Sequence, residues 1–71
     1  MNKEKTIGNR IKEKMVALNL TLFGLSKRSD IQEQTLRKWV FGKSRPSDIE
    51  MLSRLADALE TTTDWLIAGK E

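Results

Sequence analysis

Two short apolar patterns on either side of a tight turn constrain this chain more than any other feature. They lie in the segment from Leu20 to Arg45, LTLFGLSKRSDIQEQTLRKWVFGKSR. Its apolar positions suit the facing sides of two short helices: Leu25, Ile31, Leu36 and Trp39. Between them stand polar residues that a fully buried helix would not carry: Gln32, Glu33, Gln34, Arg37 and Lys38. The segment therefore predicts two helices joined by a turn, with an outward polar face on the second.

That polar face has the donors and acceptors needed to read the edges of DNA bases. Gln34 suits adenine, which an amide can bond through two atoms, and the forked guanidinium of Arg37 suits guanine. For Arg37 and Lys38, contacts with bases and with phosphates remain alternatives. Glu33 could accept from cytosine, or it could only cap the helix. As an acid facing phosphates it costs affinity and could instead discriminate against wrong sites. The segment is typical of a DNA-reading helix-turn-helix.

Composition narrows the function further. The chain has 71 residues, enough for one domain (1–71), and it contains neither cysteine nor histidine. Disulfides, zinc fingers and thiol or imidazole chemistry are therefore excluded. We expect no catalytic residue, no metal, no cofactor and no small-molecule substrate. No apolar run approaches the ~20 residues of a membrane span, so we expect a soluble protein of the bacterial cytoplasm or nucleoid.

Charge is unevenly distributed along the chain. Residues 1–47 carry eleven of the thirteen Lys and Arg residues but only four of the ten acids, whereas residues 48–71 are acidic. The basic part contains the predicted reading helix. This polarity suits a protein with one face toward a polyanion, although it is also compatible with an ordinary solvated surface.

Helical periodicity recurs along the chain, so we predict an all-α fold of five helices without strands. Residues 1–5 are polar and should be frayed. A first helix over residues 6–18 is predicted by apolar residues spaced four, four and three apart: Ile7, Ile11, Met15 and Leu18.

The two helices of the central motif carry their own boundary signals. Thr21 is a suitable N-cap for a second helix over residues 21–28. Asp30 and Glu33 have the spacing of a capping box that would open the third helix. That helix should end at residue 40 or 41, because Gly42 readily adopts a left-handed conformation.

Two further helices are predicted after the motif. Ser47 and Glu50 have capping-box spacing. The fourth helix that they open has the apolar residues Ile49, Leu52, Leu55, Ala56 and Leu59. A short last helix should begin near Thr63 or Asp64 and end at Gly69.

Taken together, four segments resemble the lambda-repressor-like helix-turn-helix family, which includes phage repressors and the all-helical Cro proteins. In order, they are IGNRIKEKMVALNLT, LSKRSDIQEQTLRKW, GKSRPS and IEMLSRLADALETTTDWLIAG. The resemblance covers about residues 6–69. It implies a compact five-helix DNA-binding domain in which the second and third helices form the helix-turn-helix.

The resemblance also implies which residues meet DNA. The third helix would lie in the major groove of a double-stranded operator. Positions that match the base-reading sites of the family are Glu33, Gln34, Arg37 and Lys38. Positions assigned to the DNA backbone or the minor groove are Thr21, Gln32, Lys43, Ser44 and Arg45.

This sequence departs from the family pattern at several positions. Leu22 replaces a glutamine that commonly bonds phosphate, and Asp30 replaces the usual glycine of the turn. Val40 and Phe41 stand where polar residues are usual. With Phe23, these apolar residues could fold inward, contact thymine methyl groups or bind another protein, and the sequence does not decide between these alternatives.

The function predicted from these observations is repression of transcription by a phage or prophage repressor of Cro or repressor type. We expect it to occupy its operator as a homodimer that is weak off DNA. The candidate dimer contact is the apolar run Trp65, Leu66 and Ile67, of which at least one residue should point outward. The alternatives are a protein-binding regulator, such as an antirepressor or antitoxin-like module, and the N-terminal half of a longer repressor.

Overall fold

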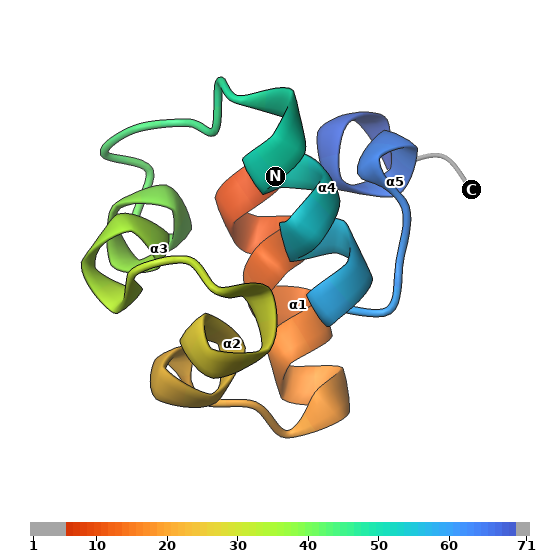
Figure 1. The fold of residues 1–71 in the computed structure, drawn as a ribbon. Coiled ribbons are helices and arrows are strands. Elements are labelled where there is room, and N and C mark those ends of the chain that lie inside the picture. The colour runs from red at the N-terminus through yellow and green to blue at the C-terminus, as the bar shows by residue number, and fades with distance from the viewer. Residues whose placement is uncertain (1–5, 70–71) are drawn as a thin grey trace.

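The computed structural model describes residues 6–69, which form five helices and no strand (Figure 1). The helices are α1 (Ile7–Leu18), α2 (Leu22–Ser29), α3 (Glu33–Val40), α4 (Ile49–Ala58) and α5 (Thr63–Ala68). The predicted all-α class and the five-helix count are confirmed. The segment that we expected to be frayed, residues 1–5, lies outside the described residues.

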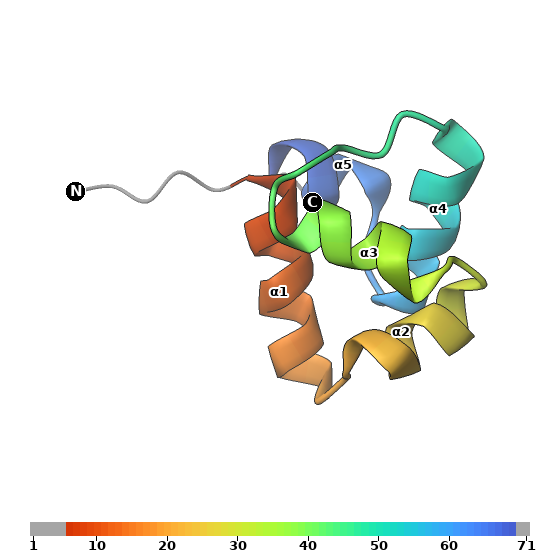
Figure 2. The ribbon, with the colours of Figure 1, turned by 90° about the vertical axis from the view of Figure 1, so that its left-hand side faces the viewer.

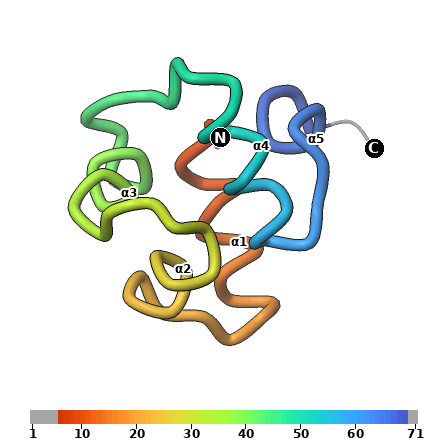
Figure 3. Tube along the Cα trace, viewed as in Figure 1, coloured from red at the N-terminus to blue at the C-terminus, as the bar shows by residue number. Residues whose placement is uncertain are grey.

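In one view α1 and α4 overlap, with α2 and α3 on one side of them and α5 on the other (Figures 1 and 3). A view turned by 90° shows that α1 and α4 lie on opposite sides of the molecule (Figure 2). Seen from the side of the central motif, α3 crosses the front of the molecule, between α1 and α4 (Figure 2). Consequently α3 has one side against the core and the other free.

Three of the helices begin in the same way, because a threonine precedes each of them. Thr6, Thr21 and Thr62 have extended backbones, and each hydroxyl accepts from an amide three residues ahead at 3.0–3.1 Å. This bond satisfies a donor that the helix itself cannot pair. The predicted N-cap role of Thr21 is confirmed.

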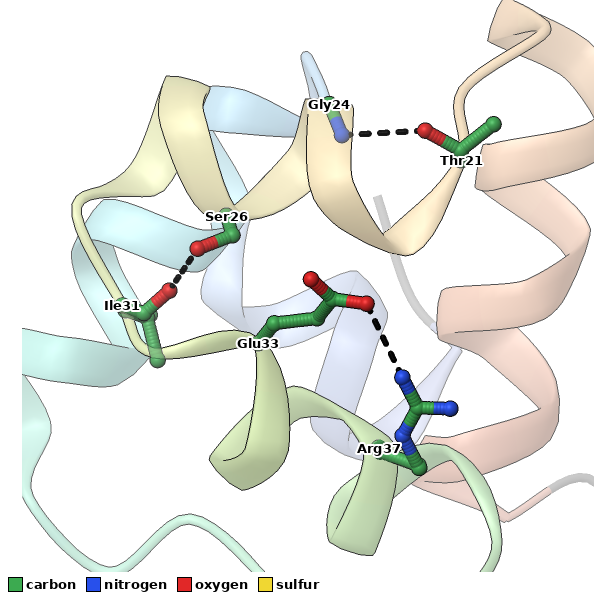
Figure 4. A network of polar contacts seen from close by, with 6 residues as sticks. All are labelled: Thr21, Gly24, Ser26, Ile31, Glu33 and Arg37. Carbon is green, nitrogen blue, oxygen red and sulfur yellow. Dashed lines mark hydrogen bonds and ion pairs between the residues drawn. The ribbon is translucent and has the colours of Figure 1, made fainter.

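The turn between α2 and α3 is built differently from our expectation. Asp30 ends α2 in the left-handed conformation (φ 59°), and its amide donates to the carbonyl of Ser26. It therefore does not form a capping box with Glu33, and that prediction was wrong. The N-cap of α3 is Gln32, whose side chain makes no capping bond. The hydroxyl of Ser26 donates to the carbonyl of Ile31 and fixes the turn (Figure 4).

The start of α4 also differs from the prediction. Its N-cap is Asp48, not Ser47, and Oδ1 of Asp48 accepts from the amide of Glu50 at 2.9 Å. Ile49, which we assigned to the apolar face, is 78% exposed. Ile49 is exposed because the first turn of α4 extends beyond the core, where residues 47–50 are all exposed.

The core joins all five helices, and the four apolar residues predicted for the central motif are all buried in it. Within the core, α1 and α3 approach each other closely. A Cβ built on Gly8 of α1 would lie 2.6 Å from the carbonyl oxygen of Trp39 and 2.8 Å from that of Val40. Glycine is needed at this position because α1 packs directly on the backbone at the end of α3.

Arginines tie the helix-turn-helix to the rest of the fold. Arg28 of α2 donates to the carbonyl of Ala58 at the end of α4. In return, Arg54 of α4 donates to the carbonyls of Ser29 and Asp30 at the end of α2. Each cation thus pairs with the negative end of the other helix. The two contacts fix the orientation of α2, and with it the turn that leads into α3.

Candidate nucleic-acid interface

The outer side of α3 carries the residues that the sequence assigns to base reading. Gln34, Arg37 and Lys38 are exposed, whereas Leu36 and Trp39 are buried, so the helical period separates the two sets cleanly. Packing on one side holds the helix, and the polar side is left open to solvent. Such a helix can present several side chains to a groove in a fixed register.

Glu33, the fourth predicted base-reading residue, is engaged with a neighbour. Its Oε2 lies 2.9 Å from Nη2 of Arg37, one helical turn further on (Figure 4). The side chains are 39% and 52% exposed, respectively. The Glu–Arg spacing of four residues is a sequence signal for such a pair. From the sequence we considered capping, direct contact with bases and repulsion of phosphates for Glu33, and we missed this pair.

The loop after α3 is divided between two hollows. Lys43 lines an open hollow of about 200 Å³ together with Gln34, Arg37, Lys38 and Phe41. This arrangement places the first loop cation beside the outer side of α3.

The other two loop residues, Ser44 and Arg45, line a different hollow. That hollow, of about 370 Å³, is also lined by residues of α1 and by Ile67 of α5. Lys43 thus shares a hollow with the base-reading residues, whereas Ser44 and Arg45 line the other one. The backbone of Ser44 still contacts the base-reading helix, because its amide donates to the carbonyl of Lys38 at 3.4 Å. All three side chains are exposed.

The two remaining backbone candidates lie at helix starts. Thr21 is exposed, and its hydroxyl oxygen already accepts from the amide of Gly24 (Figure 4). Gln32 is exposed at the start of α3 and lines a third hollow, between α2 and α3, with Phe23 and Lys27. Both residues lie on the helix-turn-helix, and Gln32 lies next to the base-reading set in the sequence.

The apolar departures from the family pattern do not form one patch of four residues. Val40 is buried (8% exposed), so of the alternatives left open it folds inward, and Leu22 is half-buried against the core. Phe23 and Phe41 remain, each 61% exposed. These two aromatic side chains are the exposed part of the predicted patch.

The apolar run in α5 is divided by the helix. Leu66 is fully buried, so it cannot contact a second protomer, and that assignment was wrong. Trp65 is half-buried, with Nζ of Lys14 4.8 Å from its ring centroid. Ile67 is 51% exposed. One residue of the run therefore points outward, as predicted.

Within residues 6–69, no helix is long and apolar enough to cross a membrane. The same residues contain no group of three or more carboxylate, histidine or cysteine side chains that could hold a metal ion.

A family model described as "Helix-turn-helix" matches residues 11–66. The chain belongs to the helix-turn-helix family. The matched range contains α2 and α3 and ends within α5, so the resemblance stated from the sequence is confirmed. No curated protein matches the chain.

Two solved structures of the P22 c2 repressor share this fold. One is described as a crystal structure of the repressor with a synthetic operator. It superposes with a TM-score of 0.86 at 24% identity, over 94% of this chain and 100% of that one. The other is described as a solution structure of the DNA-binding domain. Its TM-score is 0.81 at 26% identity, over 93% of this chain and 84% of that one. Both are lambda-repressor-like helix-turn-helix folds.

Proposed function

We propose that this protein is a DNA-binding transcription regulator of repressor type, which occupies an operator through α3. The observation that carries the proposal is the exposed set Gln34, Arg37 and Lys38 on a helix whose other side is fixed in the core. The likeness to the P22 c2 repressor, described in complex with a synthetic operator, supports it.

In this proposal α3 enters the major groove. The amide of Gln34 bonds an adenine through N6 and N7, and the guanidinium of Arg37 bonds a guanine through O6 and N7. Lys43 lies beside them and meets a phosphate, which supplies affinity without sequence choice. The ammonium of Lys38 reaches either a base or a phosphate. Repression follows when the bound protein covers a promoter.

The protein acts as a single domain that binds as a two-fold dimer, with half-sites about one helical turn, roughly 34–36 Å, apart. The dimer contact is the outward Ile67 with the exposed part of Trp65. In a two-fold arrangement the same patch on each protomer covers its symmetry mate. Because the patch is small, the dimer forms mainly on DNA. The resemblance to phage repressors makes a phage or prophage origin part of the proposal.

Selection of bound sites from random DNA tests this function. We expect the parent protein to enrich a two-fold symmetric site. Gln34→Ala and Arg37→Ala should each lose roughly 1–3 kcal/mol of binding at one base pair per half-site while keeping the parental melting temperature. Asp57→Asn, which changes an exposed carboxylate of α4, is a control that should bind with the parental preference. Failure of the parent protein to enrich any sequence would reject the proposal.

A second candidate is a protein-binding regulator with the same fold. The observation in its favour is the exposure of Phe23 and Phe41, since aromatic side chains are enriched at the centres of protein interfaces. Measurement of operator preference in the variant Phe23→Ser distinguishes the two functions. Under the repressor proposal this variant keeps the operator preference of the parent, whereas a protein-binding regulator has no such preference to keep.

A further inference from the structure

We propose that Glu33 is a positioning residue, which holds the guanidinium of Arg37 toward a guanine and makes no contact with a base itself. The inference rests on the proposed function. It assigns to Glu33 a part in specificity that differs from direct base reading and from helix capping.

The geometry of the ion pair supports this role. Nη2 of Arg37 donates to Oε2 of Glu33 at 2.9 Å, and the two side chains lie along the outer side of α3 (Figure 4). Both residues are on the same helix, so the pair forms without any movement of the backbone. The carboxylate lies in the first turn of α3, where the positive end of the helix dipole favours a negative charge.

The pair leaves Arg37 able to bind a base. A guanidinium has five N–H donors, and the bond to Glu33 uses one of them. Bidentate recognition of guanine O6 and N7 uses two more. A carboxylate that holds one edge of the planar group therefore leaves donors for the base. The bond also restricts the rotamers of Arg37 before DNA binds, which lowers the entropy cost of ordering this side chain on binding.

The shape of the surface agrees with this arrangement. Glu33, Gln34 and Arg37 alone line an open hollow of about 470 Å³ on α3. Glu33 also lines the hollow between α2 and α3, so it stands between the two. A base edge that enters the first hollow meets the amide of Gln34 and the guanidinium of Arg37, and Glu33 at the same hollow is bonded to that guanidinium.

The charge of Glu33 adds a second effect. Where the opposite base cannot accept from Arg37, the carboxylate still faces the phosphates of the groove and repels them. At guanine, the two hydrogen bonds to Arg37 outweigh this cost. Glu33 should therefore lower the affinity for DNA of any sequence, whereas the preference for guanine comes from its hold on Arg37.

A double-mutant cycle tests the inference with the full chain and a selected operator. The proteins are the parent, Glu33→Gln, Arg37→Ala and the double variant, each titrated on operators with all four base pairs at the position that depends on Arg37. In Glu33→Gln we expect the preference for guanine to fall about two- to tenfold, the range set by freeing one mobile side chain. Affinity for unrelated DNA should rise. In the Arg37→Ala background, Glu33→Gln should change no base preference.

Two controls make the outcome specific. Asp57→Asn makes the same change in net charge at an exposed position of α4 and should leave the guanine preference intact. The melting temperature of Glu33→Gln should stay near that of the parent, because an exposed pair of this spacing contributes only a few tenths of a kcal/mol.

Other results would overturn the inference. An unchanged guanine preference in both Glu33→Gln and Glu33→Ala would show that Arg37 needs no positioning, because alanine removes the acceptor oxygen that glutamine keeps. An effect at a different base pair that persists without Arg37 would show that Glu33 contacts a base directly. Either result leaves the proposed function standing, whereas a parent protein without sequence preference would reject the function itself.

Discussion

Replacing Gly8 with alanine should destabilise the protein, although alanine is the better helix former. The added Cβ would lie 2.6 Å from the carbonyl oxygen of Trp39, whereas real Cβ contacts essentially never fall below 3.0 Å. The obstructing atoms belong to the backbone of α3, so no rotamer change relieves the clash and α1 must move away. Overpacking of this kind costs about 1–3 kcal/mol, and the gain in helix propensity is about 1 kcal/mol. We therefore expect a net loss of up to about 2 kcal/mol.

Thermal and urea unfolding, followed by circular dichroism, measure this loss. At this chain length 1 kcal/mol corresponds to roughly 4–8 °C in melting temperature. Gly24→Ala is the matched control, because its Cβ would meet only Leu20 and Thr21 side-chain atoms at 3.4 Å, an ordinary contact. That variant should be neutral or more stable by up to ~1 kcal/mol. If Gly8→Ala melted as high as Gly24→Ala, the close packing of α1 on α3 would be refuted.

Four further changes test other parts of the structure. Trp39→Ala should lose about 3–5 kcal/mol of stability, because Trp39 is 4% exposed; a variant that melts like the parent would place it on the surface. Lys43→Ala should reduce the salt dependence of DNA binding by about one unit and affect all sequences alike. Arg45→Ala, from the other hollow, should either do the same or change the preference for A·T-rich flanks, since narrow minor grooves attract arginine. Ile67→Asp should keep the fold but lower the cooperativity of operator binding in sedimentation experiments; one protomer per operator in the parent would rule out the dimer.

Much of the fold was predictable because its signals are local. The threonine at residue 21 and the glycines at residues 42 and 69 mark helix ends through their own conformational preferences, and the structure places helix boundaries beside all three. The alternation of buried and polar residues along α3 likewise follows from one helical period. Trp39 was assigned to the core on this basis, and it is buried.

The errors arose where two local signals compete or where distant residues decide. Asp30 can cap the following helix or end the preceding one, and its left-handed backbone shows that the second role prevails. Ile49 fits the apolar period of α4 but lies beyond the reach of the core. Leu66 and Ile67 are neighbours with similar side chains, and only the packing of α5 on α1 and α4 determines which one is buried.

Counting charged residues in the sequence does not show which arginines are available to bind DNA. Arg10, in the basic part of the chain, donates to the carbonyls of Leu66 and Ile67 at the end of α5, 56 and 57 residues away. Arg28 likewise donates to the end of α4, 30 residues away. Both add to the positive charge of the first part of the chain, yet both are engaged in holding helices together. The cations that line the hollow on the outer side of α3 are Arg37, Lys38 and Lys43. The salt dependence of DNA binding should therefore follow the cations of α3 and its loop, and the composition of the chain overstates the charge available to DNA.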